Sequence, residues 1–309
     1  RLIDGTDGAT LWADRYEGAR DGLMAFRDKV PEALVDAMAV DLSARDRQRL
    51  AIRDTADPEA LENVMHARRA LSMFTYEGSL AAEKQLRQAI ARDPQYARAY
   101  AELAAAFVIR MENDWIVLTG ADTTKAFYFA ERALELDPDL WFSHYALGRL
   151  HSVASTGDTQ AALRYLKRAM ELHPASDDAR VYYGILLMMA GELPDAREIL
   201  MSAIAAHPQA PFWYHLGLAN LHFHQQEYEQ ALIVVDRCLA QMPNSPYCLR
   251  TQIAVLARLG RMDDVDWTIG EYEMLGHEVS LDAMMKSSIE KDPSLRAHLR
   301  ESYRLAGVE

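Results

Sequence analysis

The sequence predicts an all-α protein, built as a right-handed solenoid of about six helix pairs and preceded by a short β-hairpin and a helix. Three observations support this fold class. A set of small and apolar residues recurs along most of the chain, a proline closes most copies of the set, and half of the 309 residues are apolar. A single helix pair cannot bury its own apolar face, so repeated pairs must stack on one another.

The recurring set has a small residue, an apolar residue four positions later, a small residue three further on and a proline five after that. Five segments match it: Ala82, Leu86, Ala89 and Pro94; Ala126, Ala130, Ala133 and Pro138; Ala162, Leu166, Ala169 and Pro174; Ala196, Leu200, Ala203 and Pro208; Ala231, Val235, Cys238 and Pro243. A sixth, without the proline, has Val265, Ile269 and Tyr272. The proline ends its helix because it offers no N–H to the next turn.

A second helical pattern precedes these sets, with an aromatic or polar residue, then Leu or Tyr, then Gly or Ala. It reads "AYAELAAAF" at 99–107, "HYALGRLH" at 144–151 and "WYHLGLAN" at 213–220. Together the two patterns resemble the tetratricopeptide repeat, a helix-turn-helix unit of about 34 residues. We therefore interpret residues 57–309 as a tetratricopeptide-repeat solenoid with a C-terminal capping helix.

Residues 1–52 differ in kind from the repeats. The stretch "RLIDGTDGATLWADRYEG" has two β-like runs around a Gly-Thr-Asp-Gly turn, which predicts a hairpin or the end of a sheet. From Leu23 to Leu50, apolar residues recur at helical spacing, interrupted near Pro31. A lone hairpin is barely stable in water. We expect this segment to be the remnant of an upstream α/β domain, or to form a homodimer through the hairpin or the helix.

The stretch "LIDGTDGATLWADRY", the helix after it and the repeats from "DPEALENVMHARRAL" onward resemble a known arrangement. It is the region downstream of the catalytic domain in bacterial class III adenylate and guanylate cyclase-like proteins, here with the end of a TolB- or FlgO-like segment. The closing "SSIEKDPSLRAHLRESYRLAGVE" is similar to the end of such proteins. Related architectures place the same region after a winged-helix transcriptional regulator domain.

The resemblance implies a module without catalysis of its own. No stretch of this chain could form the ferredoxin-like sheet that carries the metal-binding aspartates of a class III cyclase, so catalysis would lie upstream of Arg1. The resemblance therefore implies an interaction, regulatory or oligomerisation module of a bacterial signalling protein. Pro31 departs from the pattern, because the helix around it is uninterrupted in such proteins.

Composition limits the partners. Lys and Arg number 33 against 46 Asp and Glu, for a net charge of −13, which argues against nucleic acid or an anionic membrane as a partner.

Cys238 and Cys248 are the only cysteines, so we expect a reducing cytoplasm and an inert buried thiol at Cys238. We expect no cofactor and no catalytic residue. Asp263, Asp264 and Asp266 fit a helix start better than a cation site.

The first helix of each pair is expected to line the concave wall. Ten residues are predicted to face this groove: Tyr145, Arg149, Val181, Ile185, Met188, Met189, Tyr214, Leu218, His222 and Arg250. Its centre is apolar and rich in methionine, which favours a protein or peptide partner. One alternative is a small-molecule sensor that binds in repeats three to five. Another is that the C-terminal helix, with Leu295, Leu299, Tyr303 and Leu305, covers the groove or caps the stack.

Two further stretches were candidates for function. The cluster "WYHLGLANLHFH" holds His215, His222 and His224, but their helical positions do not let three ligands converge, so no metal site is expected. The second repeat carries about ten extra residues, in "MENDWIVLTGADT" at 111–123. Trp115, Ile116 and Leu118 there are either a docking tip or a loop packed on its own solenoid.

Overall fold

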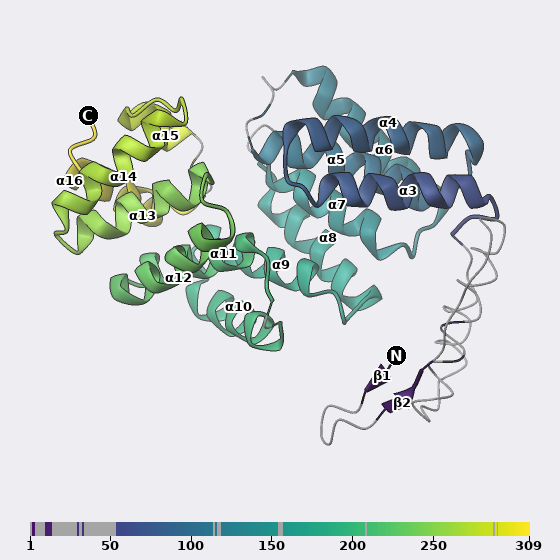
Figure 1. The fold of residues 1–309 in the computed structure, drawn as a ribbon, viewed down its shortest axis with the longest axis horizontal. Coiled ribbons are helices and arrows are strands. Elements are labelled where there is room, and N and C mark those ends of the chain that lie inside the picture. The colour runs from purple at the N-terminus through teal and green to yellow at the C-terminus, as the bar shows by residue number, and fades with distance from the viewer. Residues whose placement is uncertain are drawn as a thin grey trace. The chain divides into compact units, whose positions relative to one another are not determined.

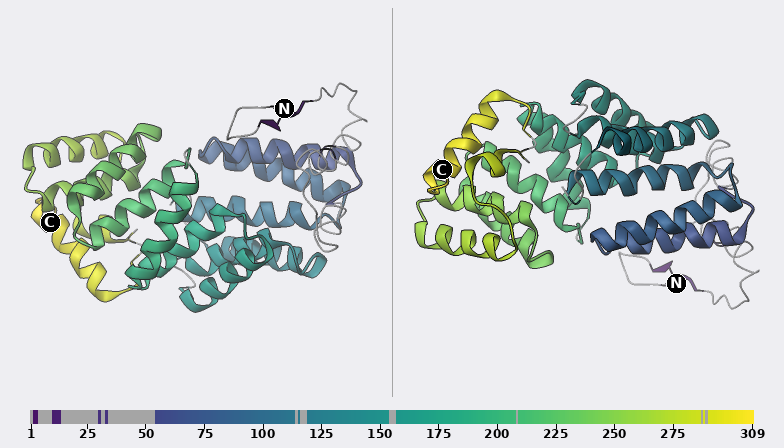
Figure 2. Two further views of the ribbon diagram at one scale, coloured as in Figure 1. Left: turned by 90° about the horizontal axis from the view of Figure 1, so that it is seen from below. Right: turned by 90° about the horizontal axis from the view of Figure 1, so that it is seen from above.

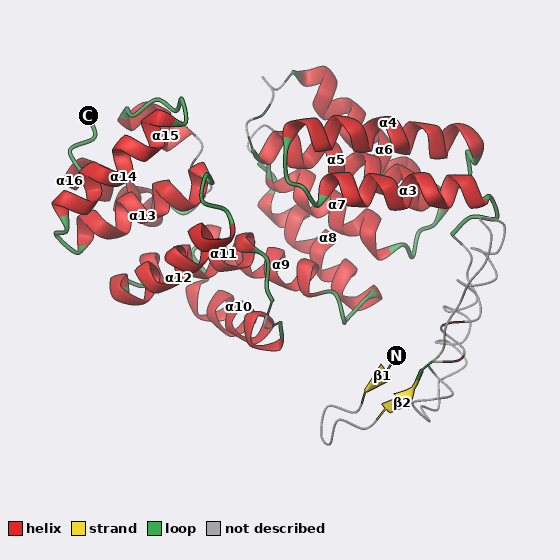
Figure 3. Ribbon diagram, in the orientation of Figure 1, coloured by secondary structure: helices red, strands yellow, loops and turns green. Residues whose placement is uncertain are grey.

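The computed structural model describes residues 2–3, 10–13, 30, 33, 54–113, 115, 119–153, 157–207, 209–286, 288 and 290–309. From residue 54 onward, its regular elements within the described ranges are all helices (Figure 1, Figure 3). Its contacts divide the chain into two compact units, Arg1–Leu140 and Trp141–Glu309. The predicted helix over residues 23–50 lies almost wholly outside the described residues.

The first unit begins with two short strands and continues with two helix pairs. β1 (Leu2–Ile3) and β2 (Thr10–Trp12) pair in antiparallel fashion, with Leu2 opposite Trp12. Residues 4–9 between them lie outside the described part of the chain, so the hairpin stays a prediction. The pairs are α3 (Pro58–Leu71) with α4 (Tyr76–Arg92), and α5 (Ala97–Glu112) with α6 (Gly120–Leu136).

The second unit holds four helix pairs and two closing helices. The pairs are α7 (Trp141–Ser152) with α8 (Thr159–Leu172), α9 (Asp177–Met189) with α10 (Leu193–Ala206), α11 (Phe212–His224) with α12 (Tyr228–Gln241), and α13 (Pro246–Arg258) with α14 (Met262–Met274). α15 (Leu281–Lys286) and α16 (Pro293–Leu305) follow. Across the described ranges, α3–α14 thus form six successive pairs, in agreement with the repeat count that the sequence predicts.

Local sequence explains where the helices start and stop. Asp57, Thr75, Asp158, Ser176 and Ser245 cap helix N-termini, each with its side-chain oxygen accepting from a backbone N–H of the first turn. The second helices end before the prolines of the repeat. α4, for example, ends two residues ahead of the proline at position 94. The proline rule therefore holds in the structure.

The recurring set forms the contact between helices. Its members at the small and apolar positions of the second helices are fully buried: Ala82, Leu86, Ala89, Ala126, Ala130, Ala133, Ala162, Leu166, Ala169, Ala196, Leu200, Ala203, Ala231, Val235 and Cys238. The glycines of the first helices meet them closely. A Cβ on Gly148 would lie 2.6 Å from Leu166 Cγ, and one on Gly184 would lie 3.0 Å from Leu200 Cγ. Small residues are therefore required at these crossings.

The sequence prediction for Cys238 is confirmed for its burial but wrong about a free thiol. Cys238 near the end of α12 and Cys248 near the start of α13 are both fully buried, and a disulfide joins them. The stacking of α12 on α13 brings their Cα atoms to 6.2 Å, a normal separation for such a bond. The thiol at Cys238 is therefore paired rather than free. The expectation of a reducing compartment loses the support that it drew from unpaired cysteines.

The C-terminal segment, which runs from α15 to Glu309, packs on the last helix pairs. α16 contacts α13 and α15, and in both views of Figure 2 the yellow C-terminal helix lies beside the yellow-green helices that precede it. Met284, Met285, Leu299 and Tyr303 join the core of the last pair.

In the described ranges, none of the helices is both long enough and apolar enough to span a bilayer.

Candidate partner-binding wall

The first helices of the second unit stand side by side. α9 contacts both α7 and α11, and α11 also contacts α13. Each second helix packs on the first helix of its own pair, and α8, α10 and α12 also pack on the first helix of the next pair. The first helices therefore form a continuous surface, which we call the first-helix wall (α7, α9, α11 and α13).

A row of aromatic rings runs across this wall from α7 to α11. The ring of Phe142 lies 5.6 Å from that of Tyr145, which lies 6.1 Å from Tyr182, which in turn lies 6.5 Å from Trp213. Tyr145 is buried, whereas Phe142, Tyr182 and Trp213 are half-buried. We call these four residues the aromatic row. Three of the four residues therefore keep part of their surface open to solvent.

Arg149 fixes the start of the row. Its guanidinium carbon lies 5.3 Å from the ring centre of Tyr145 and 5.5 Å from that of Tyr182, within the range of a cation–π interaction. The hydroxyls of Tyr182 and Ser152 are 3.1 Å apart, which adds a hydrogen bond between α9 and α7. Tyr145 and Tyr182 are thus held in place by contacts within the unit.

The ten predicted groove residues all lie on the first helices, but most are buried. Tyr145, Arg149, Val181, Met188, Met189, Tyr214, Leu218, His222 and Arg250 are buried, and Ile185 is half-buried. Each therefore offers little surface to a partner, and a binding role for them stays a prediction. Sequence reasoning missed the half-buried rings beside them. The neighbouring pairs Tyr182–Tyr183 and Trp213–Tyr214 were the available signal.

Tyr214 has a structural partner on the preceding first helix. Its hydroxyl donates to Asp178 Oδ1 at 2.8 Å. Burial, the charge of Asp178 and this hydrogen bond all raise the pKa of Tyr214. The phenol therefore stays protonated and ties α11 to α9.

His222 closes the turn between α11 and α12. Its Nδ1 lies 2.6 Å from Glu227 Oε2, and the same carboxylate accepts from Arg197 Nη1 at 2.9 Å. The hydrogen bond from Arg197, followed by that from His222, lowers the pKa of Glu227. The Nδ1 atom of His222 is thus occupied by a structural contact to Glu227 and is not available to a partner.

His224 holds the C-terminal segment against the wall. Its Nε2 lies 3.1 Å from Glu290 Oε1, and both side chains are buried. Burial alone would raise the pKa of Glu290, but the hydrogen bond and charge of His224 outweigh it and lower this pKa. The ring of His298 on α16 stacks on Phe223 at 4.5 Å. Residues of α11 and of the C-terminal segment therefore form one buried contact.

The same segment crosses the end of α9. The backbone N–H groups of Lys291 and Asp292 both donate to the carbonyl of Met189, each at 3.0 Å. Arg258 on α13 donates to Ser302 Oγ at 2.7 Å. The C-terminal segment thus contacts the wall at the C-terminal ends of α9, α11 and α13. That the C-terminal helix covers the groove stays a prediction. The aromatic row lies on α7, in the middle of α9 and at the start of α11.

The three clustered histidines occupy separate surroundings. His222 and His224 contact different carboxylates, whereas His215 is half-buried and its pKa is lowered by burial and then by the charge of Arg237. In the described part of the chain, no group of three or more His, Cys, Asp or Glu side chains is arranged to hold a metal ion.

Of the predicted docking residues, only Trp115 is described; Ile116 and Leu118 lie outside the described residues. The ring of Trp115 is half-buried and lies edge-on to Phe74 at 5.7 Å, and its backbone N–H donates to the carbonyl of Arg110. Trp115 therefore packs on the turn between α3 and α4 of its own unit. A docking role for the other two residues stays a prediction.

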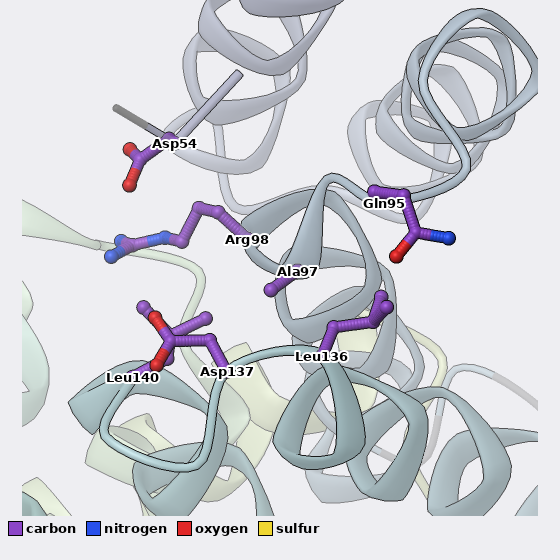
Figure 4. Close-up of a pocket in the computed structure, with 7 residues that line it drawn as sticks. All are labelled: Asp54, Gln95, Ala97, Arg98, Leu136, Asp137 and Leu140. Carbon is purple, nitrogen blue, oxygen red and sulfur yellow. The ribbon is translucent and has the colours of Figure 1, made fainter. Parts of the chain in front are cut away.

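Two small pockets in the described structure lie away from the aromatic row. One, of about 210 Å³, is lined in the first unit by Asp54, Gln95, Ala97, Arg98, Leu136, Asp137 and Leu140 (Figure 4). In that view, the guanidinium of Arg98 lies between the carboxylates of Asp54 and Asp137, and it also donates to Glu102 at 2.8 Å. The other, of about 250 Å³, lies between α7 and α8 beside His144 and Tyr165. Because Arg98 already binds a buried carboxylate, the first pocket fits a structural role.

Comparison with known proteins supports the repeat. Residues 154–216 match the model of the tetratricopeptide repeat family. The match covers α8, α9 and α10, so tetratricopeptide units build part of the wall. Among solved structures, the fold is similar to that of the APC/C hetero-tetramer Cut9–Hcn1, at 14% identity and a TM-score of 0.55, over 94% of this chain and 52% of that one.

Part of the chain is also similar in sequence to a protein named as a cyclase. The chain is 32% identical over 147 residues to a protein named putative adenylate cyclase 3 of Rhizobium meliloti (strain 1021). The match covers 48% of this chain and only 25% of that protein. A thermophilic tetratricopeptide protein of Thermus thermophilus is also similar, at 18% identity and a TM-score of 0.49, over 65% of this chain and 98% of that one.

Proposed function

We propose that this chain is a non-catalytic interaction and regulatory region of a bacterial signalling protein of the adenylate cyclase type, and that a protein segment binds along its first-helix wall. The aromatic row carries the proposal. Tyr and Trp are enriched at protein interfaces because they bury a large area at little cost in side-chain entropy. Three half-buried rings on three successive first helices suit an apolar segment that lies across the helix axes.

The cyclase context rests on the Rhizobium relative. The match spans only a quarter of that protein. Cyclase activity, which the name of that protein indicates, is therefore proposed for a longer protein that contains this chain, and not for the chain itself. Binding of a partner to the wall would then act on a catalytic domain elsewhere in the same protein. Self-association through residues 1–52 belongs to the same proposal, and light scattering of the chain with and without these residues would test it.

The small-molecule alternative has weaker support. It would need open space beside Val181, Met188 and Met189, and these side chains are buried. The C-terminal segment also occupies the carbonyl of Met189. A second alternative is that this chain is the regulatory region of a winged-helix transcriptional regulator. The gene sequence upstream of Arg1 would decide between a cyclase domain and a winged-helix domain.

A peptide selection tests the proposed wall. We would select random peptides on the full 309-residue chain and measure the affinity of the enriched peptides for Trp213→Ala and for Tyr128→Ala. Tyr128 is a matched control because it is an aromatic residue, 58% exposed, on α6, which is not part of the wall. We expect at least roughly tenfold weaker binding to the Trp213 variant, as for a typical hot-spot residue. Equal affinities for both variants would contradict the proposal.

A direct assay tests the absence of catalysis. The chain alone, incubated with ATP and Mg²⁺, is expected to give no cyclic AMP above a blank without protein. The non-catalytic assignment would be contradicted if cyclic AMP formation co-purified with the chain and persisted in the Trp213→Ala variant.

A further inference from the structure

The outward side of α14 carries large apolar side chains that nothing in the described structure covers. Trp267 is 72% exposed and Met274 is 80% exposed. On a helix, residues seven apart lie on the same face, so the two side chains stand in line. An exposed tryptophan is costly in water, because its ring is large and mostly apolar. This helix face therefore differs from an ordinary solvated one.

Between the two side chains the helix is narrow. Gly270 lies three residues after Trp267 and four before Met274, and a Cβ added to it would meet no atom within 4 Å. Packing against this unit therefore does not require a glycine there. The missing side chain leaves a notch in which another backbone could approach closely. We call Trp267, Gly270 and Met274 the α14 strip.

Acidic residues flank the α14 strip on both sides. At 100° per residue, Asp264 and Glu271 fall on one side of it, and Asp266 and Glu273 fall on the other. Asp264 forms an exposed ion pair with Arg261, which precedes the helix. From Met262 to Met274, the helix contains no Lys, Arg or His. Asp263, four residues before Trp267, lies on the same face as the strip, at its N-terminal end. From Trp267 to Met274, the strip is thus an apolar seam between two negative rails, each with acidic groups seven residues apart.

This arrangement specifies the chemistry of its occupant. We propose that the α14 strip docks an amphipathic helix of another protein, with an apolar stripe flanked by basic side chains. Leucine-sized residues would pack around Trp267 and into the notch at Gly270, while Lys or Arg side chains would pair with the rails. A second copy of this chain fits poorly, because it would place acidic rails against acidic rails. The surface is separate from the first-helix wall.

The test uses the full chain and synthetic peptides. The probe is a helical peptide of about 20 residues with leucines along one stripe and lysines on both sides of it. One control peptide has the same composition in scrambled order, and a second has glutamates in place of the lysines. The scrambled peptide measures the general attraction of a basic peptide to a chain of net charge −13. Affinity is measured by calorimetry at two salt concentrations.

We expect the amphipathic lysine peptide to bind at least roughly tenfold more tightly than either control peptide, and more weakly at higher salt. Trp267→Ala should lose at least roughly tenfold in affinity. Ile233→Ala, which removes a 48% exposed side chain from the outward side of α12, should bind within about twofold of the wild type. The Asp266→Lys, Glu273→Lys double variant should weaken the lysine peptide and improve the glutamate peptide.

Three results would overturn the inference. The first is equal affinity for the amphipathic and scrambled peptides. The second is binding that Trp267→Ala leaves unchanged. The third is a concentration-dependent dimer that dissociates in Trp267→Ala, since the occupant would then be a second copy of the chain. Trp213→Ala should leave binding of the lysine peptide unchanged, so failure at the α14 strip and failure at the first-helix wall can be told apart.

Discussion

The second helices α8 and α14 occupy equivalent places in their pairs, yet their outward sides differ. On α8, Leu166 is fully buried, the outward positions hold Arg164 and Lys167, and none of its large apolar side chains is exposed. On α14, Val265 is fully buried in the same way, but Trp267 points outward and is 72% exposed. Stacking therefore needs only the inward set. The outward apolar residues of α14 have no part in it, and a binding surface explains them.

The glycines of the two pairs show the same difference. Gly148 on α7 is needed because a Cβ there would lie 2.6 Å from Leu166 Cγ, whereas Gly270 on α14 faces open space. The first glycine belongs to the packing of the solenoid. The second weakens its helix by about 1 kcal/mol relative to alanine without any gain in packing.

Removing an inward side chain should have the largest effect on stability. Leu166→Ala should lower the free energy of unfolding by about 2–5 kcal/mol, because it opens a cavity at a fully buried position. Trp267→Ala, the matched outward change, should alter it by no more than about 0.5 kcal/mol. Urea denaturation followed by circular dichroism measures both. Comparable losses in the two variants would show that Trp267 is part of the fold.

Gly148→Ala should be the next largest change. It should destabilise the chain by about 1–3 kcal/mol, because the methyl group overpacks the α7–α8 crossing. The thermal midpoint measures the effect. A rise in the midpoint would mean that α7 and α8 lie further apart than the contact between Gly148 and Leu166 indicates.

Gly270→Ala should have the opposite sign. Since its Cβ would meet no neighbour, alanine should stabilise the chain by up to about 1 kcal/mol through helix propensity alone. The same denaturation experiment serves as the readout. Destabilisation would reveal a close neighbour at this position and would argue against an open notch.

Acid should loosen the inward side of the last pairs, where the C-terminal segment packs, with a smaller effect. Burial, followed by the charges of Arg258 and His224, lowers the pKa of His298 from 6.5 to about 4. The unfolded chain therefore binds more protons between these values, so the stability from neutral His298 is present above pH 6.5 and is lost as the pH falls toward 4. The lowered pKa of Glu290 acts in the same direction at lower pH.

His298→Phe checks this pH dependence. Phenylalanine keeps a ring against Phe223 but cannot titrate, so the thermal midpoint should fall less between pH 6.5 and pH 4 than in the wild type. A variant with the same slope as the wild type would assign the acid sensitivity to other groups. The comparison is made at constant ionic strength so that only protonation changes.

The sequence predicted the solenoid well because its packing is periodic. Ala162, Leu166 and Ala169 recur in other units, and one unit's pattern indicates the contacts of the next. The period could not predict contacts that join distant, non-repeated residues. His224 and Glu290 are 66 residues apart, and neither belongs to the recurring set. The disulfide escaped prediction for a related reason, since it depends on how two particular helix ends meet.

The candidate sites were predicted less completely than the fold. The first helices were expected to line a binding surface, but the residues chosen were those with packing roles, such as Val181 and Met188, and they are buried. Rings at adjacent positions, such as Tyr182, keep part of their surface open. Helical periodicity alone does not separate a fully buried position from a half-buried neighbour, because both fall on the same broad face. Trp267 could not be predicted from the period, because it belongs to none of the recurring positions.

The central claim is that the first-helix wall binds protein segments while the outward side of α14 is a second, separate surface. Hydrogen exchange of the full chain, with and without a peptide selected on it, tests the first part most directly. We predict slower exchange concentrated in α7, α9 and α11, absent in Trp213→Ala and retained in Trp267→Ala. Changes confined to α14, or a pattern that Trp213→Ala does not alter, would contradict the claim.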